Sequence, residues 1–69
     1  MKEIVFLVEE APEGGYMARA LGESIFTEAD TIEALRAGVL DAVRCHFDAV
    51  QSMPRLVRLH FVRDELLTA

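Results

Sequence analysis

Only one stretch of the chain repeats its apolar residues with the spacing of a helix. The presence of a single helix is the feature that most constrains the fold. Between Thr31 and Ala49, apolar side chains recur every three or four residues, which places them on one helix face. The residues of this face are Ile32, Leu35, Val39, Val43, Phe47 and, just beyond the helix, Val50. One helix covers only one face of a sheet. We therefore expect a helix packed on a sheet whose other face has no cover.

Four segments around this helix have the alternating or continuous apolar pattern of strands: Lys2–Glu9, Tyr16–Leu21, Ser24–Glu28 and Leu56–Arg63. Apolar side chains occupy both faces of the first segment, so we expect it in the centre of the sheet or with its second face against a partner. A proline and two glycines between the first two segments predict a turn, which makes residues 2–21 a β-hairpin.

The helix has recognisable start and stop signals. Asp30, with Glu33 three residues later, predicts a start that resembles a capping box, and Thr31 is the competing cap. Pro54 ends the helical segment, because the residue before a proline disfavours the α conformation. Residues 64–69 follow the last strand and are enough for one helical turn.

The order β-β-β-α-β is typical of a small α+β domain, and residues 1–69 are expected to form a single domain. We expect a mixed sheet in which the last strand lies beside the first and parallel to it. The second and third strands would extend antiparallel on the other side. Because so short a chain buries only about 60% of its unfolded surface, we expect a homodimer or higher homo-oligomer.

The sheet face opposite the helix is the predicted binding surface. It is too apolar to lie in water, and large apolar patches usually mark interfaces. The residues expected on it are Val5, Leu7, Met17, Arg19, Leu21, Arg58, His60 and Val62. Within this set we assign the protein interface to Val5, Leu7, Met17, Arg19 and His60.

Charge and composition disfavour several other classes of protein. Twelve acidic and seven basic residues give a net charge of −5, which suits a basic protein partner and disfavours direct nucleic-acid binding. The single cysteine, Cys45, excludes an intramolecular disulfide and favours a cytoplasmic location. The longest apolar run, Ile4–Val8, is too short to span a membrane.

Catalytic and metal-binding patterns are weak. Two-metal nuclease chemistry needs converging carboxylates, and the run Ile4–Val8 on the first strand contains none. Cys45 and His46 point about 100° apart on a helix, and His60 adds too few ligands for structural zinc. We therefore predict no catalytic residue, no metal, no cofactor and no enzymatic activity.

Two segments resemble those of HicB-like antitoxins. The run from Val8 to Ala18, VEEAPEGGYMA, is similar to the amino-terminal hairpin of that family, with its apolar strand, acidic residues, glycine turn and aromatic residue. The run from Phe26 to Leu35, FTEADTIEAL, is similar to the family's approach to its helix, with Ala29 where the family has glycine. The resemblance covers about residues 4–50 and implies a partial ribonuclease-H-like fold.

The resemblance also implies a function, which is to bind and block a small HicA-type ribonuclease toxin. Family members commonly carry a carboxy-terminal DNA-binding module. No such segment follows Arg63, so we expect a short form that does not repress transcription. We thus expect a non-catalytic interaction module that masks the basic surface of a small toxin. The alternative is a stand-alone homodimer with a structural or small-ligand-binding role.

Overall fold

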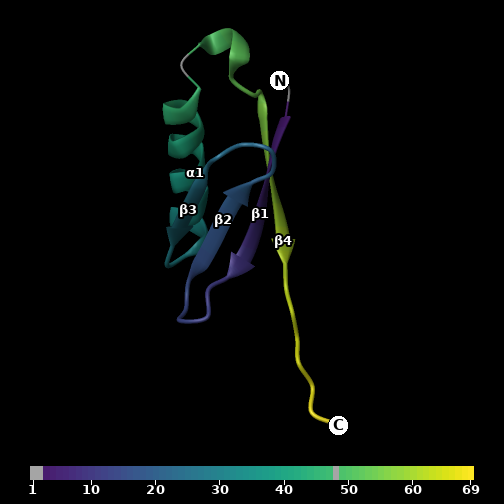
Figure 1. Cartoon of the computed structure of the whole chain (residues 1–69). Coiled ribbons are helices and arrows are strands. Elements are labelled where there is room, and N and C mark those ends of the chain that lie inside the picture. Colours follow the sequence, from purple (N-terminus) through teal and green to yellow (C-terminus); the bar gives the residue numbers. More distant parts are fainter. Residues whose placement is uncertain (1–2, 48) are drawn as a thin grey trace.

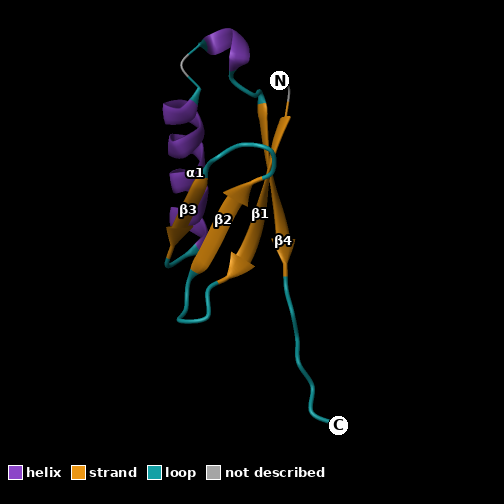
Figure 2. Cartoon of the chain, in the orientation of Figure 1, coloured by secondary structure: helices purple, strands orange, loops and turns teal. Residues whose placement is uncertain are grey.

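The computed structural model describes residues 3–47 and 49–69, without the side chain of Val50, as four strands and one long helix (Figures 1 and 2). The predicted order β-β-β-α-β is confirmed, with a short 3₁₀ helix added after α1. Lys2 and Asp48, which fall inside predicted elements, lie outside the described residues. The elements are β1 Glu3–Glu10, β2 Tyr16–Ala20, β3 Phe26–Ala29, α1 Ile32–His46, η1 Val50–Ser52 and β4 Leu56–Val62.

The sheet has the predicted order, β3-β2-β1-β4, with β1 inside it. β1 pairs antiparallel with β2 and parallel with β4, and β2 pairs antiparallel with β3. Phe6 of β1 marks the register, since it lies opposite Ala20 on β2 and Leu59 on β4. The architecture is a small α+β domain with one helix on a mixed sheet, as the sequence predicts.

The turn between β1 and β2 needs its glycines. The Gly14 N–H donates to the Ala11 carbonyl at 3.0 Å, and the Ala11 N–H donates to the Gly15 carbonyl at 2.9 Å. Gly15 has φ +80°, and a Cβ at this position would lie 2.7 Å from the carbonyl oxygen of Ala29 at the end of β3. The hairpin turn and the end of β3 therefore approach each other too closely for any side chain.

The helix starts at a different cap from the one we favoured. Thr31 has an extended backbone, φ −129° and ψ 160°, and its Oγ1 accepts a hydrogen bond from the Ala34 N–H at 3.1 Å. Asp30 as the cap, paired with Glu33, is wrong; Thr31, the competing cap, is the observed one. The residue three positions after Thr31 is Ala34, whose methyl group cannot accept the hydrogen bond that completes a capping box. Glu33 lies in the first turn, where a negative charge favours the helix dipole.

The helix also ends earlier than Ala49. Phe47 leaves the helix with φ −101° and ψ 112°, while its N–H still donates to the Val43 carbonyl at 3.1 Å. Its half-buried side chain packs against the core. The Ser52 N–H and hydroxyl both donate to the carbonyl of Ala49, at 3.1 and 3.0 Å, and these bonds close the separate turn η1.

The strand ends also differ from prediction: β1 and β3 each end one residue later, and β2 and β4 each end one residue earlier. Two larger differences concern the start of β3 and the residues after β4. The third strand begins at Phe26, not at Ser24, because Ile25 is buried in the connection and its carbonyl accepts from the Ala20 N–H at 2.9 Å. Residues 63–69 form no helical turn but continue β4 away from the sheet as an extended segment (Figure 1).

The core lies between α1 and one face of the sheet. Gly38 lets the helix approach β3 closely, since a Cβ there would lie 3.2 Å from Thr27 Oγ1. α1 lies over β3 and β2 (Figure 2), so the helix side of β4 is less covered. Phe61, on that side of β4, is 51% exposed. Among the described residues, no helix is long and apolar enough to cross a membrane. The core residues are Ile4, Phe6, Val8, Ala18, Ala20, Ile25, Leu35, Val39 and Val43.

Candidate protein-interaction surface

All five predicted interface residues lie on the sheet face that α1 leaves uncovered. The helix side of β1 is marked by its buried residues Ile4, Phe6 and Val8, so the alternate residues project from the other face. Val5 and Leu7 come from β1, Met17 and Arg19 from β2, and His60 from β4.

The strand register brings these residues together around Leu7. Leu7 lies directly opposite Arg19 on β2 and His60 on β4, and Arg19 in turn lies opposite Phe26 on β3. Met17 lies opposite Glu9 in the next row. Directly opposite residues are about 4.5–5.5 Å apart and share a face. The predicted residues therefore form one continuous surface with Leu7 in its middle.

We call this surface the open sheet face, and it is larger than the prediction. Sequence patterning missed Phe26, which is 60% exposed, because its position opposite Arg19 depends on how the third strand pairs with the second. It also missed the carboxylates of Glu9 and Glu28, which follow from the register alone. The open sheet face comprises Glu3, Val5, Leu7, Glu9, Met17, Arg19, Phe26, Glu28, Leu56, Arg58, His60 and Val62. Leu21, which we expect on this face from the sequence, instead lies one residue beyond the end of β2.

The face has an apolar centre and a charged surround. Val5, Leu7 and Met17 are only half-buried, whereas Arg19 and His60 are exposed beside them. An apolar centre with polar groups around it is the usual composition of a protein–protein interface. Among the described residues, no buried side-chain polar atom lacks a hydrogen-bond partner.

One ion pair bridges β1 and β4 at the edge of this face. The Arg58 guanidinium donates through Nε to Glu3 Oε2 and through Nη2 to Glu3 Oε1, the latter at 3.4 Å. The hydrogen bond from Arg58, with its positive charge, holds the pKa of the Glu3 carboxyl below its ordinary value of 4.5. The same pairing raises the pKa of Arg58, so both groups stay charged at neutral pH.

The histidine and cysteine at the end of α1 have different surroundings. His46 Nε2 lies 3.1 Å from Glu23 Oε1 in the β2–β3 connection, and its ring packs edge-on against Phe47 at 5.0 Å between centroids. The contact between His46 and Glu23 thus joins the end of α1 to the β2–β3 connection. Cys45 is exposed and free. Over residues 3–47 and 49–69, no three His, Cys, Asp or Glu side chains gather as a metal site requires.

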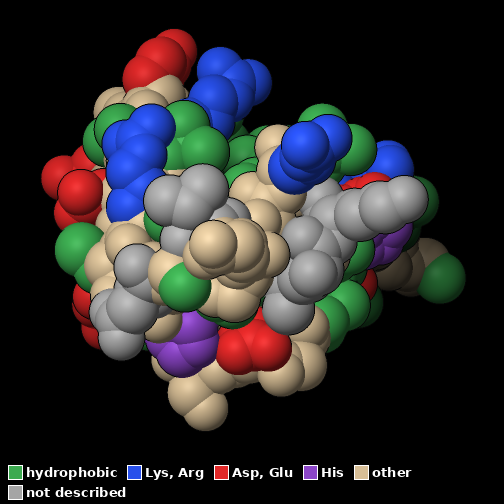
Figure 3. Space-filling view, turned by 90° about the horizontal axis from the view of Figure 1, so that it is seen from above, with side chains coloured by type: hydrophobic (Ala, Val, Ile, Leu, Met, Phe, Trp, Pro, Cys, Tyr) green, Lys and Arg blue, Asp and Glu red, His purple; other side chains and the backbone are tan. Residues whose placement is uncertain are grey.

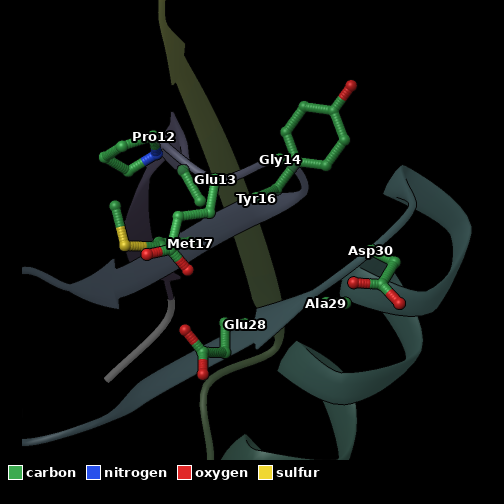
Figure 4. Close-up of a pocket in the computed structure, with 9 residues that line it drawn as sticks. Pro12, Glu13, Gly14, Tyr16, Met17, Glu28, Ala29 and Asp30 are labelled. Carbon is green, nitrogen blue, oxygen red and sulfur yellow. The ribbon is translucent and has the colours of Figure 1, made fainter.

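Acidic residues surround a hollow of about 630 Å³ beside the hairpin turn. Figure 4 shows Glu13, Glu28 and Asp30 around it, with carboxylates that do not converge on one point. Figure 3 shows the opposite end of the molecule, where Arg side chains lie among hydrophobic, acidic and His side chains.

A second hollow lies on the helix side of the sheet, at β4. It has a volume of about 260 Å³, and its lining is largely apolar. Arg36, Val39 and Leu40 of α1 form one wall, and Val57 and Leu59 of β4 form the other. We call it the helix–β4 groove.

Known proteins similar to this chain identify its family. No family model matches the chain, and no solved structure matches it significantly. A UPF0150 protein of Thermotoga maritima is 46% identical over 63 residues, which are 91% of this chain and 87% of that protein. A UPF0150 protein of Archaeoglobus fulgidus is 58% identical over 45 residues, which are 65% of this chain and 67% of that protein. The chain belongs to the UPF0150 family.

Proposed function

We propose that this chain is a non-catalytic interaction module, a short HicB-like antitoxin whose open sheet face masks a small, basic HicA-type ribonuclease toxin. The resemblance of its hairpin and helix entry to that family supports the proposal, and so does its strand order around a single helix. The fold is then a partial ribonuclease-H-like fold that has kept the sheet and lost the catalytic carboxylates.

The observation that carries the proposal is the apolar centre of the open sheet face. Val5 and Leu7 lie two residues apart on β1, Met17 lies diagonally across from Leu7 on β2, and the helix lies on the other side of the sheet. Their burial against a partner removes apolar surface from water, at about 25 cal/mol per Å². A flat, continuous surface of this kind suits a protein partner better than it suits a small substrate.

The acidic charge adds selectivity for a basic partner. The chain has a net charge of −5, and Glu9 and Glu28 flank Met17 on the open sheet face itself. A ribonuclease that binds RNA has a positive surface. Opposite charges across an interface raise the rate of association and select against acidic proteins. We place this encounter in the cytoplasm, where the free thiol of Cys45 stays reduced.

Capture of a partner by charge-reversed variants tests the proposal. Tagged wild type is expected to recover a small basic protein from the source lysate in fixed stoichiometry, and to suppress the RNA cleavage of that protein. The double variant Val5→Glu, Leu7→Glu is expected to recover no such partner. The matched control, Ala34→Glu with Ala37→Glu, adds the same charge at exposed positions on α1 and should retain the partner.

Two results would contradict the proposal. If the partner binds Val5→Glu, Leu7→Glu as tightly as wild type, the open sheet face is not the binding surface. If wild type elutes alone as a defined oligomer, the stand-alone homodimer is the better reading, with a structural or small-ligand-binding role.

A further inference from the structure

The outer edge of β4 has no strand beside it in the described part of the chain. β4 ends the sheet order and pairs with β1 alone, as Figure 2 shows. It is seven residues long, Leu56 to Val62, and contains no proline, no lysine and no acidic residue. Such residues usually protect an exposed edge from pairing with another chain. This edge is therefore open to a further strand.

The helix–β4 groove lies on the helix side of β4, and its largely apolar lining suits an apolar occupant. Val57 and Leu59 line it from β4, and both are only half-buried. The next residue on the same side of β4 is Phe61, which is 51% exposed and does not line the groove. A strand added antiparallel at the edge would place one of its own side chains across from Leu59.

A second copy of β4 supplies that strand and that side chain. When two copies pair antiparallel with both helices on the same side, opposite residues must project from the same face. Registers centred on Leu59, His60 or Phe61 meet this condition. Centred on Phe61, Leu59 lies opposite Arg63 and Val57 lies opposite Glu65, so both groove residues of β4 face a charged side chain. Centred on His60, only Val57 does, opposite Arg63.

Charge decides between the other two registers. Centred on Leu59, Arg55 of each copy lies opposite Arg63 of the other, so that like charges meet twice. Centred on His60, Arg55 lies opposite Glu65, and Phe61 lies opposite Leu59. Opposite charges across strands stabilise the pair and like charges destabilise it. The register centred on His60 therefore places Phe61 opposite Leu59 and pairs Arg55 with Glu65, while His60 lies opposite itself.

We propose that two copies of this chain join through antiparallel β4 strands centred on His60, and that Phe61 of each copy fills the helix–β4 groove of the other. The two four-stranded sheets then form one continuous sheet. Both helices lie on one side, and the open sheet faces lie next to each other on the other. In this arrangement Arg55, just before each β4, lies opposite Glu65, just after the other. The dimer deepens the proposed function, since it would present two partner-binding faces side by side.

Cysteine cross-linking of the purified chain tests the register. In a Cys45→Ser background, His60→Cys places two thiols across the axis, about 4.5–5.5 Å apart at Cα, which suits a disulfide. Arg58→Cys and Val62→Cys are the matched controls on the same face of the strand, where each thiol is displaced from its own copy. Mild oxidation is expected to link His60→Cys into dimers at least about tenfold faster than either control. Faster linkage of a control, or no linkage at all, would overturn the proposed register.

Substitutions that leave the fold intact test the contacts. Phe61→Glu is expected to weaken the dimer at least about 100-fold, as for a central apolar anchor, while Phe26→Glu at the opposite sheet edge leaves it unchanged. Arg55→Glu should weaken it about tenfold, and adding Glu65→Arg should restore it. Analytical ultracentrifugation of the purified proteins measures the dimer dissociation constant of each variant. A dimer insensitive to Phe61→Glu contradicts the proposal. These measurements need no partner, so their failure would leave toxin binding by the open sheet face untouched.

Discussion

Gly15 gives the sharpest stability prediction, because the neighbouring Gly14 provides a built-in control. Both glycines have positive φ, +105° and +80°, where alanine costs about 1–2 kcal/mol. Both alanine variants also regain about 0.4–1 kcal/mol from a less flexible unfolded chain. The two positions differ in the space available to an added Cβ. A Cβ on Gly14 meets nothing within 4 Å, whereas a Cβ on Gly15 would lie 2.7 Å from the Ala29 carbonyl oxygen.

The clash at Gly15 involves backbone, which cannot rotate away. Overpacking of this kind costs about 1–3 kcal/mol. We therefore expect Gly14→Ala to lower the free energy of unfolding by about 1 kcal/mol or less and Gly15→Ala to lower it by about 2–4 kcal/mol. Urea unfolding followed by circular dichroism measures both, at equal protein concentration because dimerisation adds to stability. Equal losses for the two variants would refute the close approach of the hairpin turn to β3.

Three further predictions concern the cap, the core and the ion pair. Thr31→Ala should lower the free energy of unfolding by about 1 kcal/mol, whereas Asp30→Ala should change it little; the reverse order in urea unfolding would restore Asp30 as the cap. Phe6→Ala should cost about 3–5 kcal/mol by the same assay, because this fully buried side chain leaves a cavity. The lowered pKa of Glu3 stabilises the fold above pH 4.5, and this contribution is lost as the pH falls through the pKa in the folded state. Glu3→Gln should therefore flatten the acid side of the stability–pH curve, and an unchanged curve would show that the bond to Arg58 does not persist in solution.

The fold was largely predictable because its local signals agree. The helical spacing of apolar residues in α1 and their alternation in β4 both match the observed elements. β1, which is apolar on both faces, lies inside the sheet. Boundaries were less predictable, because they depend on contacts between elements. Ile25 has the side chain of a strand residue, yet it is buried in a turn whose shape is set by the Ala20 hydrogen bond. Either Asp30 or Thr31 suits a helix cap, and only the backbone conformation decides between them.

The candidate surface was predictable to the extent that side chains alternate along strands. Val5 and Leu7 must share a face whatever the register. The neighbours of this pair across the sheet, such as Phe26 and Glu28, required the strand pairing itself. The helix–β4 groove was not predictable, because it exists only where α1 lies over β2 and β3 and leaves β4 partly uncovered.

The central claim is that the apolar centre of the open sheet face binds a basic protein partner. The most direct test is the dissociation constant of that partner for wild type, Leu7→Glu and Ala37→Glu, measured by calorimetry at physiological salt. The account predicts a loss of at least about 100-fold for Leu7→Glu, at the middle of the face, and no change for Ala37→Glu on the far side of α1. Equal affinity of wild type and Leu7→Glu for the partner would contradict the claim.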